Sequence, residues 1–232
     1  NNVPMTVYST NQNGGISGDG ATFALDGAHV LPKQALGYEY VVQTASFDRI
    51  ATEFVVMSTK SGRTNVKLSL TTNSRKTNKQ ELNFTFTKAK QIYIVRSQSP
   101  TTDEGSEETM MDLSGSLVCA DAPVAVWCGN QLAHIPTNEK NISQDYAVDQ
   151  LLPISRWQNE FVVPLTGLLT RWNEVHVISL EDDNKVDIYG NKNKTTPMSK
   201  TLNSREKWVR EVKGQVLGNV LDSTLYIKAA KP

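Results

Sequence analysis

Tryptophan is the residue type in this chain best suited to ligand recognition, because an indole ring can stack on a sugar while its N–H stays available to a polar partner. The chain has four tryptophans. Trp127 and Trp208 occur in runs that predict strands, at positions where an aromatic residue recurs, and we expect both in the core. Trp157 and Trp172 lie in or near predicted loops. We therefore expect Trp157 and Trp172 to form the ligand-binding surface.

Residues able to catalyse a reaction or to hold a metal are scattered along the chain. His29, His134 and His176 occur without His-x-His or His-Glu-x-x-His spacing, and the chain has no Gly-x-Ser-x-Gly nucleophile motif. The acidic run at 103–108 lacks the alternating Asp and Asn positions of a calcium loop, which predicts a solvated insertion. We expect isolated structural histidines, no catalytic residue, no metal and no cofactor, so the chain is not expected to be an enzyme.

The two cysteines, Cys119 and Cys128, flank a turn predicted near residues 121–122. In a hairpin centred on that turn they would not be direct cross-strand partners. A strand that crosses to a second sheet would still allow a disulfide, and two buried free thiols are the other possibility. Two cysteines alone do not define a zinc site.

The composition excludes some classes of partner. Lysine and arginine number 24, aspartate and glutamate also 24, and the formal net charge is zero. No basic stripe of the kind a nucleic-acid-binding protein carries is present. No apolar run approaches the roughly 20 residues of a membrane-spanning helix. We expect a protein or glycan ligand on a host or cell surface, with neither nucleic-acid binding nor membrane insertion.

Alternating apolar and polar residues between closely spaced turn signals predict an all-β chain. Segments 53–58 and 64–70 predict a hairpin, as do 174–180 and 185–189. Segment 204–218 has helical propensity, but its repeat counterpart at 91–95 is strongly β, so we predict a strand there. A short helical turn is predicted at 145–152.

An internal repeat organises the chain. Segment 123–130 (PVAVWCGN) follows the plan of segment 4–11 (PMTVYSTN), with Pro first, Val fourth, an aromatic fifth and Asn eighth. Segment 152–163 (LPISRWQNEFVV) matches 31–42 (LPKQALGYEYVV) without a gap. The repeat predicts two tandem homologous antiparallel β-sandwich units, jelly-roll-like, covering residues 1–122 and 123–232 and packed through segment 145–153. Pro232 aligns with Pro123, so we expect the rest of a larger chain to follow it.

Several motifs occur together in a fixed order. They are LSGSLV at 113–118, DAPVAVWCGN at 121–130, DQLLP at 149–153, Trp157, and EFVVP at 160–164. In this order they resemble the N-terminal domain of the IgG Fc-binding protein family, over about residues 30–190. The resemblance implies a secreted, modular, adhesive protein. Asp145-Tyr146 replaces the family's usual Asp-His, and the extra cysteines of animal members are missing, which favours a bacterial surface-protein type of member and gives no reason to carry Fc binding over.

Three functions follow as hypotheses. The first is a non-enzymatic binding or adhesion module of a larger bacterial protein, located outside the cell or on its surface. The second is a carbohydrate-binding module that uses the loop tryptophans. The third is a structural repeat of a surface fibre, in which units complete each other by strand addition.

Overall fold

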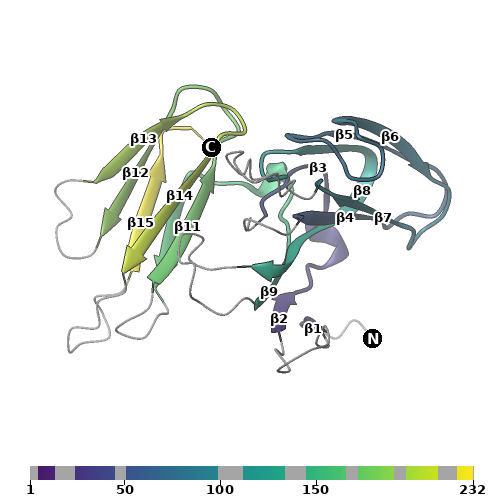
Figure 1. Ribbon diagram of the computed structural model, residues 1–232, viewed down its shortest axis with the longest axis horizontal. Helices are drawn as coiled ribbons and strands as arrows, with labels where there is room; N and C mark the ends of the chain where they lie inside the picture. Colours follow the sequence, from purple (N-terminus) through teal and green to yellow (C-terminus); the bar gives the residue numbers. More distant parts are fainter. Residues whose placement is uncertain are drawn as a thin grey trace, which may run out of the picture. The chain divides into compact units, whose positions relative to one another are not determined.

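The computed structural model describes residues 5–13, 24–44, 51–98, 112–133, 145–165, 172–190, 197–213 and 224–231. The regular structure within them consists of strands and two single-turn 3₁₀ segments (Figure 1). The all-β prediction is therefore confirmed. The chain divides into two compact units, Asn1–Arg156 and Trp157–Pro232. The repeat placed the boundary between residues 122 and 123, and that division stays a prediction.

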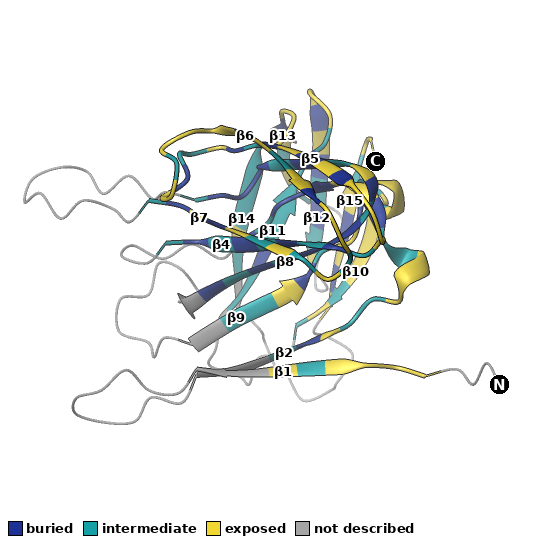
Figure 2. Ribbon diagram, turned by 90° about the vertical axis from the view of Figure 1, so that its right-hand side faces the viewer, coloured by how far each residue is buried: buried dark blue, intermediate teal, exposed yellow. Residues whose placement is uncertain are grey.

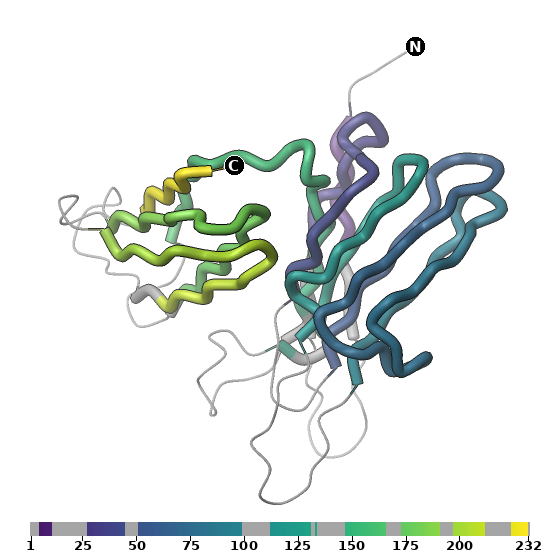
Figure 3. Tube along the Cα trace, turned by 90° about the horizontal axis from the view of Figure 1, so that it is seen from above, coloured from purple at the N-terminus to yellow at the C-terminus, as the bar shows by residue number. Residues whose placement is uncertain are grey.

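The first unit is built from nine strands in its described residues. They are β1 (Tyr8–Asn13), β2 (Ala24–His29), β3 (Gly37–Val41), β4 (Glu53–Ser58), β5 (Thr64–Ser69), β6 (Glu81–Phe86), β7 (Ile92–Arg96), β8 (Leu117–Ala133) and β9 (Asp145–Gln150), with 3₁₀ turns η1 (Lys33–Ala35) and η2 (Ile154–Arg156). The tube in Figure 3 shows strands of this unit running up and down side by side.

Strand β8 connects the pairings of the first unit because its two halves have different partners. Residues 117–120 pair with β5 and, over most of this stretch, with β3, whereas residues 124–129 pair with β4. β9 pairs with the second half of β8, from Trp127 onward. The order β6-β5-β8-β4-β7 therefore forms a continuous sheet. Pro123 lies within this strand, so no turn occurs at 121–122, and the predicted hairpin around the cysteines is wrong.

The core of the first unit lies on one side of each strand. In β4, residues 54, 56 and 58 are buried and the residues between them are half-buried, which is the period-2 pattern of a strand. The cluster draws on β3, β4, β5, β6, β7 and both halves of β8, with Tyr40, Phe54, Leu68, Val118 and Val126 among its fully buried side chains. Figure 2 shows this alternation of buried and exposed residues along the strands.

The second unit is smaller and has two separate sheets. Its strands are β10 (Glu160–Pro164), β11 (Trp172–Ile178), β12 (Asn184–Gly190), β13 (Met198–Leu202), β14 (Lys207–Lys213) and β15 (Thr224–Ala229). One sheet has the order β10-β15-β12-β13, and the other is β11-β14. Side chains from both sheets meet in one apolar cluster, which includes Val175 from β11 and Ile188 from β12.

The two units have matching sets of strand pairings, all of them antiparallel. In the first unit β3 pairs with β8, β5 with β8, β5 with β6 and β4 with β7. In the second unit β10 pairs with β15, β12 with β15, β12 with β13 and β11 with β14. The turn before β7 and the turn before β14 each contain a residue with φ of 64°, Lys90 and Arg205 respectively. The first unit has three further pairings, β4 with β8, β8 with β9 and β1 with β2, to which the described strands of the second offer no counterpart.

Two local predictions were wrong for a common reason. Strands β4 and β5 do not form a hairpin: β4 pairs with β7 and β8, and β5 pairs with β6 and β8. Strands β11 and β12 likewise belong to different sheets. Alternation tells which face of a strand is buried, but it does not tell which strand lies beside it. Residues 145–150 form β9 where a helical turn was predicted, because they pair with β8.

Candidate functional site

The candidate site is the outer face of the sheet formed by β7, β4 and residues 124–129 of β8. Cross-strand register places its side chains in rows. Trp127 lies opposite Val55, which lies opposite Ile94. One row further, Met57 of β4 lies opposite Ile92 of β7. Phe54 and Val56 between them belong to the core, so these five side chains point to the other face of the sheet.

This face, which we call the β4 face, is apolar and open to solvent. Ile92 is 57% exposed and Ile94 is 46% exposed, while Val55, Met57 and Trp127 are half-buried. Single exposed apolar side chains are ordinary on a protein surface, but here two exposed isoleucines of β7 adjoin half-buried apolar side chains of β4 and β8, which makes this face a candidate interaction surface. Aromatic, methionine and aliphatic side chains of this kind form the centres of protein interfaces.

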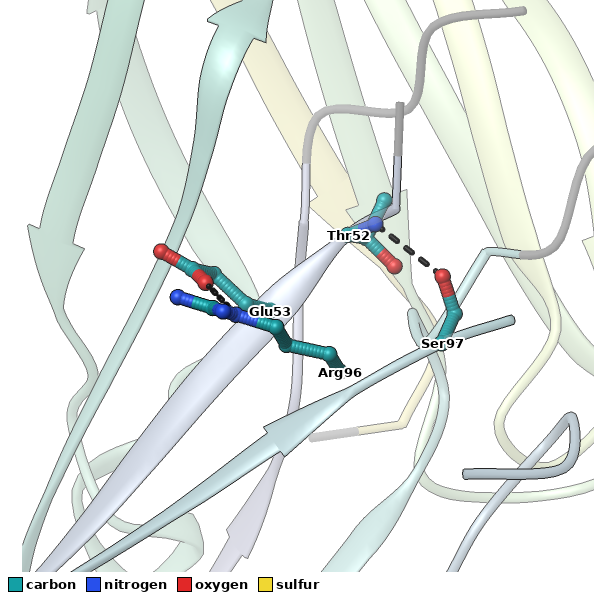
Figure 4. Close-up of polar contacts among 4 residues, drawn as sticks. All are labelled: Thr52, Glu53, Arg96 and Ser97. Carbon is teal, nitrogen blue, oxygen red and sulfur yellow. Dashed lines mark hydrogen bonds and ion pairs between the residues drawn. The ribbon is translucent and has the colours of Figure 1, made fainter. Parts of the chain in front are cut away.

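An ion pair borders the β4 face. Arg96 Nε donates to Glu53 Oε2 at 2.6 Å, from directly paired positions on β7 and β4. Figure 4 shows the two side chains lying along each other across these strands. The Glu53 side chain is only 16% exposed, whereas that of Arg96 is 48% exposed, so the guanidinium is the accessible part. A charged rim beside an apolar centre is the usual anatomy of a protein interface.

Hydrogen bonds next to the rim hold β4 and β7 in register. The Thr52 amide donates to Ser97 Oγ at 3.1 Å, as Figure 4 shows, and the Ser97 amide donates to the Thr52 carbonyl at 3.0 Å. Thr52 Oγ1 accepts from the Leu113 amide at 3.1 Å. These residues are buried, so the contacts are sheltered from water. They fix where the Glu53–Arg96 pair lies.

A glycine lies where β8 approaches β9 at the edge of the face. A Cβ on Gly129, which pairs with Glu53, would come within 2.7 Å of the Ala147 carbonyl oxygen on β9. Any larger side chain would force β8 and β9 apart. The close approach of the two strands therefore depends on glycine at this position.

Both cysteines lie on β8 and are free thiols. Cys128 is buried on the core side of the same sheet, and desolvation, with a smaller contribution from the charge of Asp149, raises its thiol pKa to about 12. Burial also raises the pKa of Cys119 above its ordinary value of 9.0. A thiol with a raised pKa is a poor nucleophile, since the thiolate is the reactive form. The alternative of two buried free thiols holds in part: both thiols are free, but only Cys128 is buried and Cys119 is half-buried.

The predicted binding residues Trp157 and Trp172 both belong to the second unit. Trp157 is half-buried before β10, and Trp172 is the first residue of β11, with a side chain outside the described residues. Their role stays a prediction. Trp208 packs against the second core as expected, whereas Trp127 faces away from the first core because it alternates with the buried Val126 and Cys128.

The three histidines come from separate parts of the chain. His29 packs edge-on against the Tyr8 ring, with 5.3 Å between the ring centroids, and His176 Nε2 lies 3.4 Å from Glu174 Oε2. His134 and the acidic run at 103–108 lie outside the described residues. Among the residues that are described, no three His, Cys, Asp or Glu side chains are arranged to hold a metal ion. In the same part of the chain, no helix is long and apolar enough to span a bilayer.

The sequence contained a signal for the β4 face that was not used. Segment 92–95 reads Ile-Tyr-Ile-Val, with apolar residues on both sides of the strand, so one side must lie outside the core unless a second layer covers it. Only Tyr93 and Val95 belong to the core cluster. The isoleucines between them are the exposed ones.

Comparison with known proteins gives one family. The family model described as IgGFc binding protein matches residues 26–232. A human protein, "IgGFc-binding protein", is 32% identical over 150 residues. That match covers 64% of this chain and 2% of the human protein, so the chain corresponds to a small part of that relative. No solved structure matches the chain significantly.

Proposed function

The chain belongs to the IgGFc-binding protein family, and from this premise we propose that it is a non-enzymatic protein-binding module that binds through the β4 face. The observation that carries the proposal is the run of apolar side chains across β7, β4 and β8, with Ile92 and Ile94 about half exposed to solvent. Leaving such side chains in water is unfavourable, and covering them with a partner recovers roughly 25 cal/mol per Å² of apolar area.

The shape of the face favours a protein as the ligand. The strands present a broad sheet surface, which suits a flat partner better than a small molecule, because small molecules bind in concave pockets. Trp127 and Met57 are residue types enriched at the centres of interfaces, and the exposed Arg96 guanidinium offers a bidentate donor to a carboxylate or carbonyl at the rim. The human relative carries Fc binding in its name, so the Fc fragment is the first ligand to test.

The experiment measures binding of the purified chain to immobilised human IgG Fc, with Fab as the control ligand. We expect binding to Fc alone. Ile94→Glu should weaken it by about tenfold or more, since it places a charge in the apolar centre. Asn83→Glu adds the same charge to an exposed position of β6, outside the β4 face, and should leave binding unchanged.

The outcomes separate the ligand from the surface. Equal binding by the wild type and Ile94→Glu would remove the β4 face from the proposal. Failure of the wild type to bind would remove Fc as the ligand. A hydrophobic fluorescent dye then tests the surface independently: dye fluorescence that Ile94→Glu does not lower would remove the β4 face as well.

The setting of the module is part of the proposal. We place it in a larger bacterial protein outside the cell or on its surface, where it acts in adhesion. The family match supports a binding role, and the sequence departures at Asp145-Tyr146 and at the cysteines support the bacterial type. A cell-fractionation experiment on a bacterium that carries the gene tests the location.

A carbohydrate is the second ligand class. Trp157 is half-buried, and an indole ring is a residue type that stacks on sugars. A glycan array tests this with Trp157→Ala and Trp172→Ala as variants. Binding to no glycan, or binding that both variants retain, would remove this alternative.

We also propose that the two units are duplicated sandwich units. Support comes from pairings that coincide residue by residue with the repeat in the sequence. Tyr40 faces Val118 as Phe161 faces Ile227, Val66 faces Ala120 as Val186 faces Ala229, and Tyr93 faces Val56 as Trp208 faces Val177. An experimental structure in which these strands fail to superpose would overturn the duplication.

A further inference from the structure

The outer face of the four-stranded sheet in the second unit carries two tyrosines side by side. Tyr226 of β15 lies directly opposite Tyr189 of β12, with 5.8 Å between the ring centroids and 38° between the ring planes. Val162 of β10 lies opposite Tyr226 on its other side. These three side chains form a row across three strands, which we call the tyrosine row.

The tyrosine row points to solvent. Tyr226 alternates along β15 with Leu225 and Ile227, which are 2% and 4% exposed and belong to the core of the second unit. Tyr226 itself is 37% exposed and Val162 is 71% exposed, while Tyr189 is half-buried. The row therefore presents ring surface on the side of the sheet that faces away from this core.

Charged side chains lie beside the tyrosine row on the same face. Lys228 of β15 lies opposite Glu160 of β10 on one side and opposite Asp187 of β12 on the other. The Nζ of Lys228 lies 3.0 Å from Glu160 Oε1, and the Nζ of Lys185 lies 3.2 Å from Asp187 Oδ1. Two residues of a strand span about 7 Å, so a ligand on the tyrosines can also reach these polar groups.

A hydrogen bond connects the rings with the charged side chains. The Tyr226 hydroxyl donates to the Glu160 carboxylate. The side chains of Glu160 and Lys228 are 50% and 53% exposed, so solvent or a ligand reaches both. A carboxylate accepts about four hydrogen bonds and an ammonium group donates three, which leaves capacity for a ligand at each. The site thus offers oriented acceptors and donors next to an accessible aromatic ring.

The balance of charge on this face indicates the class of ligand. Two carboxylates and two ammonium groups are paired with one another, so the face has no excess charge to complement an anion such as a nucleic acid. The centre of a protein interface is depleted in charged residues, unlike this face. An uncharged sugar complements both features, because its C–H surface packs on an aromatic ring and its hydroxyls form hydrogen bonds with charged groups.

The first unit forms the matching part of its sheet without aromatic rings. Leu117 of β8 lies opposite Ser69 of β5, at the places that Tyr226 and Tyr189 take in the second unit. The strand pairing is the same in both, so the sheet does not need the rings in order to form. The two tyrosines are therefore available for contact with a ligand.

We propose that the tyrosine row binds an uncharged oligosaccharide. Its sugar rings stack on Tyr226 and Tyr189, and its hydroxyls form hydrogen bonds with Glu160 and the charged groups beside it. An extended glycan needs no concave pocket, since successive sugar units can lie along a sheet. The site uses other residues than the β4 face and than Trp157 and Trp172, so it stands or fails independently of the Fc ligand and of the loop tryptophans.

A glycan array of uncharged, sialylated and sulfated oligosaccharides tests the proposal on the full chain, and calorimetry then measures the affinity for the best uncharged one. We expect binding to uncharged members of the array. Tyr226→Ala and Tyr189→Ala should each weaken it by about tenfold, because each removes a stacking ring. Tyr226→Phe keeps the ring and should stay within about threefold of the wild type.

A tyrosine of the first unit provides the matched control. Tyr38 of β3 is 54% exposed, so Tyr38→Ala also removes an exposed ring, and it should bind as the wild type does. Circular dichroism checks that each variant is folded. If an alanine variant is unfolded, NMR spectra of the wild type decide instead: the oligosaccharide should shift the amide signals of residues 187–189 and 226–228, and shifts confined to other residues would overturn the inference.

Three outcomes of the binding measurements would also overturn it. The first is a chain that binds no uncharged oligosaccharide. The second is binding to sialylated or sulfated members alone, because the paired charges of this face favour neither. The third is binding that both alanine variants retain; if Trp157→Ala then abolishes it, the sugar site belongs to the loop tryptophans. Absence of Fc binding affects none of these results.

Discussion

The two units of the chain share a pattern of strand pairing and differ in one neighbour. In the first unit, β4 has strands on both sides, and Tyr40 behind it is fully buried. In the second, β11 has one partner among the described strands, and Phe161 is half exposed. The two aromatic residues occupy matching positions in the strand pairing, so an aromatic residue type alone does not decide whether the side chain is buried.

The outer faces of the same sheets also differ. On the β4 face, Ile92 and Ile94 of β7 are exposed and apolar. The positions that correspond on β14 are Lys207 and Val209, and those on β11 include Glu174 and His176. The pairing is alike, yet the β4 face carries apolar side chains, whereas the Glu174 and His176 side chains of β11 lie 3.4 Å apart and are only 1% and 13% exposed. The strand pairing is thus the same in both units, while the residue types on the sheet faces differ, and function depends on those residues.

The largest difference between the units is expected from truncating one buried side chain on β4 and the corresponding one on β11. Phe54→Ala should lower the free energy of unfolding of the first unit by about 3–5 kcal/mol, since the ring is fully buried. Val175→Ala, at the corresponding position, removes two methyl groups and should cost the second unit about 1–2 kcal/mol. Urea unfolding measures both. Cys128 labelling serves as the reporter for the first unit, and a larger loss for Val175→Ala would reverse the comparison.

The next pair of variants removes a hydroxyl from Tyr40 in the first unit and adds one to Phe161 in the second. Tyr40→Phe leaves the Gly37 amide and the Val124 carbonyl without their buried partner, at 2.8 and 2.6 Å, and should cost about 1–3 kcal/mol. Phe161→Tyr adds a hydroxyl to a half-exposed ring and should change stability by less than about 0.5 kcal/mol. The shift in the urea midpoint gives both free-energy changes, provided that the dependence of the unfolding free energy on urea concentration stays the same. Equal destabilisation by the two variants would show that the two rings have equivalent surroundings.

Acid should destabilise the second unit more than the first. Hydrogen bonds from Lys228 to Glu160, from Ser199 to Asp187 and from the Asn203 amide to Glu206 hold the pKa of each carboxyl below its ordinary value, 4.5 for the glutamates and 3.8 for the aspartate. In the described part of the first unit, the hydrogen bond from the Asn65 amide lowers the pKa of Asp121 in the same way.

The sign follows from linkage. A carboxyl whose folded pKa lies below its unfolded pKa stabilises the fold above the unfolded value, and this contribution is lost as the pH falls through the folded value. Between about pH 6 and about pH 3, the urea midpoint of the second unit should therefore fall further. Lys228→Gln removes the main cause for Glu160 and should flatten the decline; a decline of unchanged size would rule that contribution out.

The smallest effect is expected at the rim of the β4 face. Glu53→Gln should lower the stability of the first unit by about 0.2–1 kcal/mol, because its partner Arg96 is half exposed and solvent screens the pair. The matched variant Glu206→Gln removes the partner of Lys200, 2.9 Å away, in the second unit. Thermal unfolding at low and high salt tests both: an effect that high salt leaves unchanged would exclude an electrostatic origin.

The sequence predicted the all-β class and most strands because alternation along the chain reports burial directly. It also predicted correspondences between strands, since segments such as 31–42 and 152–163 match without gaps, and the duplication stays a prediction. It could not give the neighbours of β4 and β5, because pairing between distant segments leaves no local trace. The turn predicted at 121–122 failed because Pro123 lies in a strand that continues through it.

The β4 face was missed for another physical reason. Apolar residues in a strand predict a core, and nothing local distinguishes Ile94, which faces water, from Val95, which faces the core. The binding surface was predicted at the loop tryptophans instead, because tryptophan is a residue type that often binds ligands. Only the register of three strands from separate parts of the chain brings Trp127, Val55 and Ile94 into one row.

The length of β8 has a mechanical consequence. One uninterrupted strand, Leu117–Ala133, is hydrogen-bonded to β3 and β5 at its start and to β4 and β9 further on. A force along this strand loads all of these bonds in shear at once, whereas a force at a terminal hairpin would break them one after another. One long strand therefore holds the first unit together. Under a stretching force along this strand, the first unit should unfold in a single abrupt step.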